Sequence, residues 1–132
     1  MIFDEYKIFN EDLLDIDLSE NRIINTINPH SYCIAQNDSK FHKALVSSDI
    51  LLPDGTGIVW AEKLLYGRKI DKIAGYDLFL FLISRLNKNN GRCFFLGSTV
   101  ETLSLINKKM SKDYPNIIFN YFSPPFKDEF SV

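Results

Sequence analysis

The sequence contains only two cysteines, Cys33 and Cys93, which are too few for a disulfide framework. Both lie in apolar stretches, so we expect buried free thiols in a reducing compartment. No apolar run approaches the roughly 20 residues that a membrane-spanning helix needs. The first residues also lack the basic start and the apolar run of a signal peptide. Together these absences predict a cytoplasmic protein.

Neither sign of charge dominates the sequence. It has 15 Lys and Arg against 17 Asp and Glu, a formal net charge of −2, and its basic residues are scattered. A nucleic-acid-binding surface needs clustered basic residues, so we expect no nucleic-acid partner. His30 and His42 have no metal-ligand spacing to either cysteine, and no metal site is predicted. The length and the 45% hydrophobic content predict one domain, residues 1–132.

Short apolar segments alternate with helical patterns along the chain. Apolar and β-branched residues predict strands at 6–9, 22–27, 50–52, 93–96 and 117–122. Helices are expected between them, beginning near Pro29, Asp38, Gly57, Asp77 and Ser98. Strands separated by helices pair in parallel through right-handed crossovers. The sequence therefore predicts an α/β fold, with a Rossmann-like, mostly parallel sheet and helices on both faces.

Asp54 follows directly after one of these strands and is the most informative residue in the chain. Pro53, which has no N–H, is expected to stop strand pairing just before it. Gly55 and Gly57 let the backbone approach a ligand closely. In α/β folds, ligands bind at the carboxyl ends of strands, which favours a functional role for Asp54. Asp is also a good helix N-cap, and the local sequence alone gives that structural role about equal weight.

Two other predicted strand ends have residues suited to ligand binding. Thr26 and Asn28 lie at the end of strand 22–27, and Gly97-Ser98 follows strand 93–96. Because parallel strands share one carboxyl edge, we expect these residues to border a single crevice with Asp54. Gly97-Ser98 is similar to a phosphate turn at a helix N-terminus, although a plain strand-to-helix turn explains it equally well.

Four ordered segments form a more specific pattern: Asn-Thr-Ile-Asn-Pro-His (25–30), Leu-Pro-Asp-Gly-Thr-Gly-Ile-Val-Trp (52–60), Lys-Ile-Ala-Gly-Tyr-Asp-Leu (72–78) and Phe-Phe-Leu-Gly-Ser (94–98). Their order and spacing resemble the WecG/TagA/CpsF family of bacterial glycosyltransferases, glycosyltransferase family 26. The resemblance implies an inverting enzyme that needs no metal or other cofactor. It implies transfer of an N-acetylmannosamine-type or related sugar from a UDP donor to a polyprenyl-diphosphate-linked sugar, in teichoic acid or cell-surface polysaccharide synthesis.

The resemblance also implies roles for individual residues. Asp54 matches the family's proposed catalytic base. The substrate-binding positions that it implies are Thr26, Asn28, Gly55, Lys72, Gly75, Gly97 and Ser98. Lys72 stands where many members have arginine, and a lysine keeps the charge without the bidentate fork. From the residues alone, the basic loop around Lys72 is either simply solvated or able to face a diphosphate.

The sequence stops early relative to the family pattern. After Phe126 the family continues with a Gly-x-Pro-x-Gln-Glu-like motif that helps to hold the nucleotide. Many members then have a basic segment for peripheral contact with the inner face of the cell membrane. We therefore expect these residues alone to bind UDP-sugar weakly, to transfer little, and to form a homo-oligomer through uncovered surfaces. The alternatives are a catalytically inactive remnant that binds nucleotide sugar and a generic nucleotide-binding module.

Overall fold

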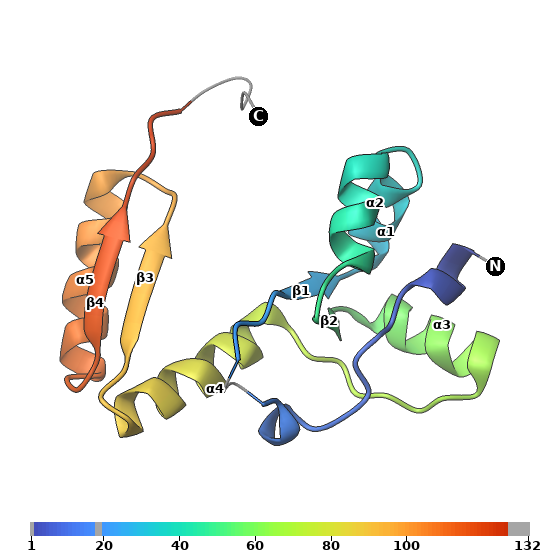
Figure 1. Ribbon diagram of the computed structural model, residues 1–132, viewed down its shortest axis with the longest axis horizontal. Helices are drawn as coiled ribbons and strands as arrows, with labels where there is room; N and C mark the ends of the chain where they lie inside the picture. The colour runs from blue at the N-terminus through green and yellow to red at the C-terminus, as the bar shows by residue number, and fades with distance from the viewer. Residues whose placement is uncertain (1, 18–19, 127–132) are drawn as a thin grey trace. The chain divides into compact units, whose positions relative to one another are not determined.

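The computed structural model describes residues 2–17 and 20–126, which divide into two compact units, Met1–Phe79 and Leu80–Val132 (Figure 1). Each unit combines helices with a two-stranded parallel sheet. The predicted α/β class with parallel strands is therefore confirmed. The strands of the described residues, however, pair as two separate sheets instead of one, because no strand of one pair bonds to a strand of the other.

The first sheet pairs β1 (Ile24–Ile27) with β2 (Ile50–Pro53). On the other side of β2, the expected strand at 6–9 is reduced to a single parallel bridge between Ile8 and Leu51. The prediction that Pro53 stops the pairing is wrong. Pro53 pairs with Ile27, and the Asp54 N–H donates to the Ile27 carbonyl at 2.9 Å. Proline lacks only the donor, and its carbonyl still accepts a 2.9 Å hydrogen bond from the Ile73 N–H.

Four α-helices begin in the first unit: α1 (Pro29–Ala35), α2 (Ser39–Val46), α3 (Thr56–Tyr66) and α4 (Gly75–Lys88). Short 3₁₀ turns, η1 (Ile2–Glu5) and η2 (Leu13–Asp15), precede them. Asn28 and Asp38 are the N-caps of α1 and α2, because their side chains accept backbone N–H bonds at the starts of these helices. Gly67, left-handed at φ 68°, ends α3.

The core of the first unit is a cluster of buried apolar side chains from the bridge, both strands and the helices: Tyr6, Ile8, Ile27, Ala35, Leu45, Leu51, Ile58 and Ile70. The expected burial of Cys33 is wrong. In α1 the buried side chain is that of Ala35, and the helical turn leaves Cys33 on the exposed side. Cys93 is half-buried, and burial raises the pKa of its thiol.

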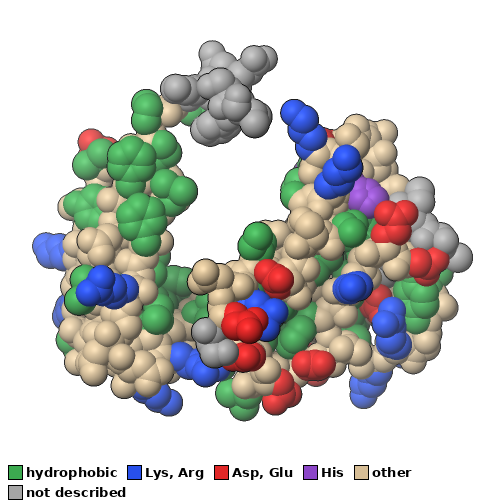
Figure 2. Space-filling view, in the orientation of Figure 1, with side chains coloured by type: hydrophobic (Ala, Val, Ile, Leu, Met, Phe, Trp, Pro, Cys, Tyr) green, Lys and Arg blue, Asp and Glu red, His purple; other side chains and the backbone are tan. Residues whose placement is uncertain are grey.

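The second unit pairs β3 (Arg92–Leu96) with β4 (Ile118–Phe122) and packs α5 (Val100–Asp113) against β4. Phe95 and Phe119 stack with ring centroids 5.9 Å apart. Apolar side chains that alternate with these two are exposed, among them Phe94 and Leu96, and hydrophobic atoms cover this region in Figure 2. Within the described residues, no helix is both long and apolar enough to cross a membrane.

Candidate active site at the carboxyl edge of the first sheet

Asp54 lies at the carboxyl end of β2 and is partly exposed. The N-cap of α3 is Gly55, at φ 92°, and no side chain bonds to the first turn of this helix. The capping role that the local sequence allowed for Asp54 is therefore wrong, because the chain turns one residue later. Among the residues that the structure describes, no hydrogen bond or ion pair engages the Asp54 carboxylate. This carboxylate is available to accept a proton.

Two glycines bring the turn after β2 close to the turn after β1. A Cβ built on Gly57 would lie 2.6 Å from the Pro29 Cγ, which is a clash, and one on Gly55 would lie 3.6 Å from the Pro29 Cδ. Only glycine at position 57 allows Pro29 to pack this closely. The close packing places Asn28, the residue before Pro29, beside the turn that presents Asp54.

Thr26 and Asn28 lie on either side of the last residue of β1. The Asn28 Oδ1 accepts the Ser31 N–H at 2.8 Å and the Ser31 Oγ accepts the Asn28 N–H at 2.8 Å, which makes a capping box. The side-chain NH₂ group of Asn28 makes no bond to the described residues. Thr26 is half-buried, and its Cγ2 would lie 3.8 Å from a Cβ on Gly75. Both side chains thus keep polar groups for a ligand.

The segment that leads into α4 reaches the same sheet edge. Ile73 bonds to the Pro53 carbonyl, so the exposed Lys72 is directly next to a residue fixed at the end of β2. The Asp77 carboxylate accepts the Ala74 N–H at 3.0 Å at the start of α4. The first N–H groups of a helix have no partner within it and form its positive end. The structure therefore gathers six of the predicted site residues: Thr26, Asn28, Asp54, Gly55, Lys72 and Gly75.

The other two predicted site residues, Gly97 and Ser98, lie in the second unit. Both have positive φ, 110° and 60°. The Gly97 N–H donates to the Phe122 carbonyl at 3.0 Å, and the Ser123 hydroxyl donates to the Ser98 carbonyl at 2.6 Å. Thr99, and not Ser98, caps α5 by accepting the Thr102 N–H at 3.2 Å. The turn exists as expected, and a crevice shared with Asp54 stays a prediction.

A pocket of about 740 Å³ lies beside this turn. Its walls come from the turn and from the segment after β4: Ser98, Thr99, Val100, Ser123, Pro124, Pro125 and Phe126. The segment after β4 was not among the predicted site residues. Its two successive prolines, Pro124 and Pro125, restrict the backbone and are the feature of the sequence that marks it.

Glu101 lies in the first turn of α5, which follows Gly97 and Ser98. A hydrogen bond from its own backbone N–H and one from the Thr99 hydroxyl hold the pKa of the Glu101 carboxyl below its usual value. A carboxylate lies in the first turn of α5, as that of Asp77 lies in the first turn of α4, so this charge does not distinguish the two helix N-termini as anion sites.

The polar groups at the first sheet edge are a carboxylate, a hydroxyl, an amide, a lysine and a helix N-terminus. Among the described residues, no group of three or more His, Cys, Asp or Glu side chains could hold a metal ion. His30 is exposed on α1, and His42 pairs with Glu5 at 3.0 Å. The site can thus supply one general base, hydrogen bonds to a polar substrate and positive charge for an anion.

A family model described as "Glycosyl transferase WecG/TagA/CpsF family" matches residues 8–131. The chain belongs to this family. The match includes all four sequence segments that resemble the family, and with them every residue gathered at the carboxyl edge of β1 and β2.

Curated relatives agree with this assignment. The chain is 36% identical over 102 residues to the N-acetylglucosaminyldiphosphoundecaprenol N-acetyl-beta-D-mannosaminyltransferase of Bacillus subtilis (strain 168), covering 77% of this chain and 40% of the relative. It is 31% identical over 118 residues to the enzyme of the same name from Bacillus spizizenii, covering 89% of this chain and 46% of the relative. The chain thus spans less than half of the length of these two relatives.

Proposed function

We propose that the chain provides the catalytic base and part of the donor site of an inverting glycosyltransferase. The reaction would transfer an N-acetylmannosamine-type sugar from a UDP donor to a polyprenyl-diphosphate-linked sugar, at the cytoplasmic face of the cell membrane. The observation that supports it best is the Asp54 carboxylate, which no described residue engages, in the turn after β2 that packs against the turn after β1. The names of the relatives, which specify an N-acetylmannosaminyl group and a diphosphoundecaprenol acceptor, support the substrate class.

In the proposed reaction, Asp54 takes the proton of the acceptor hydroxyl as its oxygen attacks the anomeric carbon of the donor sugar. The new glycosidic bond forms while the bond from that carbon to the diphosphate oxygen breaks, and UDP leaves with the electron pair. Attack opposite to the leaving group inverts the anomeric carbon. A positioned general base contributes about 100-fold or more to such a rate.

The other site residues bind and orient in this proposal. The Thr26 hydroxyl and the free NH₂ group of Asn28 hydrogen-bond to the sugar. Lys72 and the N-terminus of α4, at Gly75, stabilise the negative charge that develops on the diphosphate. Gly97 and Ser98 lie beside the pocket of the second unit, which would take another part of the nucleotide.

A transfer assay tests the proposal. Two proteins are compared: the 132-residue chain, and the same chain joined to the C-terminal part of the Bacillus subtilis relative. The donor is UDP-N-acetylmannosamine and the acceptor is a short polyprenyl-diphosphate-linked N-acetylglucosamine. We expect clear transfer by the joined protein and little by the chain alone.

Equal rates would show that the extension is not needed. UDP binding without transfer in both proteins would instead favour a role in binding nucleotide sugar only. No binding and no transfer in either protein would reject the proposed donor site.

A further inference from the structure

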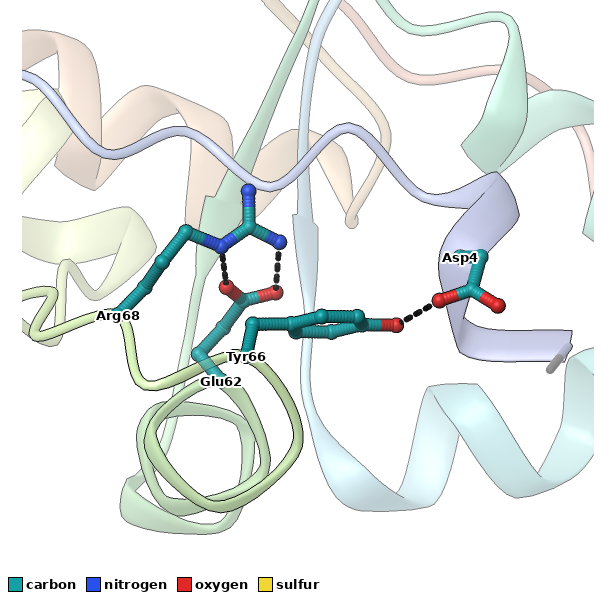
Figure 3. Close-up of polar contacts among 4 residues, drawn as sticks. All are labelled: Asp4, Glu62, Tyr66 and Arg68. Carbon is teal, nitrogen blue, oxygen red and sulfur yellow. Dashed lines mark hydrogen bonds and ion pairs between the residues drawn. The ribbon is translucent and has the colours of Figure 1, made fainter.

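Glu62 is the only buried charged residue in the part of the chain that the structure describes. Its side chain, on α3, is 2% exposed and pairs with Arg68, two residues after the end of the helix. The Arg68 Nε lies 2.7 Å from one carboxylate oxygen and the Nη2 lies 3.3 Å from the other (Figure 3). A buried carboxylate is costly without such a partner, so this contact strongly restrains Arg68.

Further contacts hold the same arginine. Its guanidinium carbon lies 4.7 Å from the centroid of the Tyr66 ring, and its backbone N–H donates to the Glu62 carbonyl at 3.3 Å. The Tyr66 hydroxyl bonds in turn to the Asp4 carboxylate of η1 (Figure 3). Together with the left-handed Gly67, this contact restrains the direction in which the chain leaves α3. The contact is planar and forked, which a guanidinium can make and an ammonium cannot.

The segment from Gly67 to Ala74 starts at this ion pair and ends at the candidate site. Ile70 is 6% exposed and belongs to the core of the first unit. Ile73 is 9% exposed and bonds to the Pro53 carbonyl at 2.9 Å. Lys72 lies between these two buried isoleucines and is itself exposed. The segment is thus held at Arg68, Ile70 and Ile73, and these three contacts determine where Lys72 and the start of α4 lie.

We propose that the Glu62–Arg68 ion pair is a positioning element that holds Lys72 and the N-terminus of α4 against the carboxyl ends of β1 and β2, where they bind the diphosphate of the donor. This role rests on the proposed function. Arg68 does not contact the donor in this scheme. It acts through the segment between Gly67 and Ala74, and so part of its effect requires Lys72.

The test uses the chain itself with four changes: Arg68→Lys, Lys72→Ala, the two combined, and Lys69→Ala as the control. Arg68→Lys keeps the positive charge beside Glu62 and removes the fork. Lys69→Ala removes one exposed positive charge from the same segment. Binding of UDP is followed by an NMR titration, which measures weak affinities without any turnover. Amide hydrogen exchange is measured at Ile73 and, as the reference within the same sheet, at Asp54.

We expect Arg68→Lys to weaken UDP binding about fivefold and Lys72→Ala to weaken it about tenfold, the usual scale for a charge-assisted contact. The combined variant should lose less affinity than the product of the two single losses, because part of the effect of the ion pair passes through Lys72. Arg68→Lys should also speed exchange at Ile73 more than at Asp54. Lys69→Ala should match the unchanged chain in both measurements.

Three results would overturn the positioning role. They are unchanged UDP affinity in Arg68→Lys, losses of affinity that multiply in the combined variant, and equal acceleration of exchange at Ile73 and Asp54, which would indicate a purely structural pair. Unchanged affinity in Lys72→Ala would instead reject the donor contact of the proposed function, and the positioning role with it. Unchanged UDP affinity in Arg68→Lys alone therefore rejects only the positioning role, whereas unchanged affinity in Lys72→Ala rejects the proposed donor contact.

Discussion

The turns after β2 and β3 both pass through a glycine with positive φ before a helix, but they differ in their polar side chains. After β3, Thr99 caps α5 and Ser123 bonds to the turn, so these groups stabilise the local structure. After β2, the cap is Gly55 with no side-chain bond, and the Asp54 carboxylate has no partner among the described residues. Similar backbone geometry thus serves structure in one turn and leaves a carboxylate available in the other.

The turn after β1 combines both uses. The Asn28 oxygen completes a capping box, while its NH₂ group is left for a ligand. A polar residue at a strand end can therefore stabilise a helix and still keep a hydrogen-bonding group available. The comparison predicts that changes at Asp54 affect transfer, whereas changes at Thr99 affect stability.

The largest effect is expected for Asp54→Asn in the joined protein. Transfer should fall at least about 100-fold, because an amide cannot accept the proton. The free energy of unfolding should change by less than about 0.5 kcal/mol, since the carboxylate makes no bond in the described structure. Initial rates and urea unfolding measure the two quantities. Near-normal transfer would remove Asp54 from the mechanism.

A substantial loss of stability is expected for Gly57→Ala. The added methyl group would lie 2.6 Å from the Pro29 Cγ and must separate the turns after β1 and β2. Overpacking of this kind lowers the free energy of unfolding by about 1–3 kcal/mol. Gly75→Ala is the matched control, because its Cβ would make an ordinary 3.8 Å contact with Thr26. Urea unfolding of the two variants checks the prediction, and equal stabilities would show that the two turns do not pack closely.

A smaller loss is expected for Thr99→Ala. Removing the N-cap of α5 should lower the free energy of unfolding by about 1 kcal/mol. Thr99→Ser, which keeps the hydroxyl, should retain most of this stability. Transfer by each folded molecule of the joined protein should fall far less than for Asp54→Asn, because Thr99 contributes only one wall of the pocket beside Gly97 and Ser98. A tenfold loss of transfer with unchanged stability would show that the turn after β3 takes part in the chemistry and would erase the distinction between the two turns.

The smallest effect is expected away from both turns, at Tyr66. Its hydrogen bond to Asp4 raises the pKa of the phenol from 10.0 to about 12. Because the folded pKa is the higher one, the stabilisation is complete below pH 10 and is lost as the pH rises toward 12. Asp4→Asn should lower this pKa toward 10.0, as measured by phenolate absorbance with Tyr66→Phe for assignment. An unchanged pKa would contradict the contact with Asp4.

Local chemistry made much of the fold predictable from the sequence. Asn28, Asp38 and Gly67 mark helix ends through bonds and backbone angles that depend on a few neighbouring residues. That Thr26, Asn28 and Asp54 lie at one edge, at the ends of β1 and β2, was predictable because parallel strands share a carboxyl edge. The cap of α3 was not predictable from the local sequence, and Gly55 takes that place instead of Asp54.

Contacts between distant segments were beyond the sequence pattern. Nothing in the periodicity indicated that Pro29 packs on Gly57, that Ser123 bonds to Ser98, or that Glu62 is buried against Arg68. The exposure of Cys33 has a similar origin, because the apolar run around it is longer than the one helix face that the core can cover. Such features depend on how segments meet in space.

Mapping UDP on the chain by NMR tests the central claim most directly, since it locates the ligand without requiring turnover. If the carboxyl edge of β1 and β2 is the donor site, the amides of Gly55 and Gly75 should shift most within the first unit. The same shifts should shrink in Lys72→Ala and persist in Asp54→Asn, because the base acts on the acceptor. Shifts that leave Gly55 and Gly75 unchanged and gather instead around His42 on α2 would contradict the assignment of this edge as the active site.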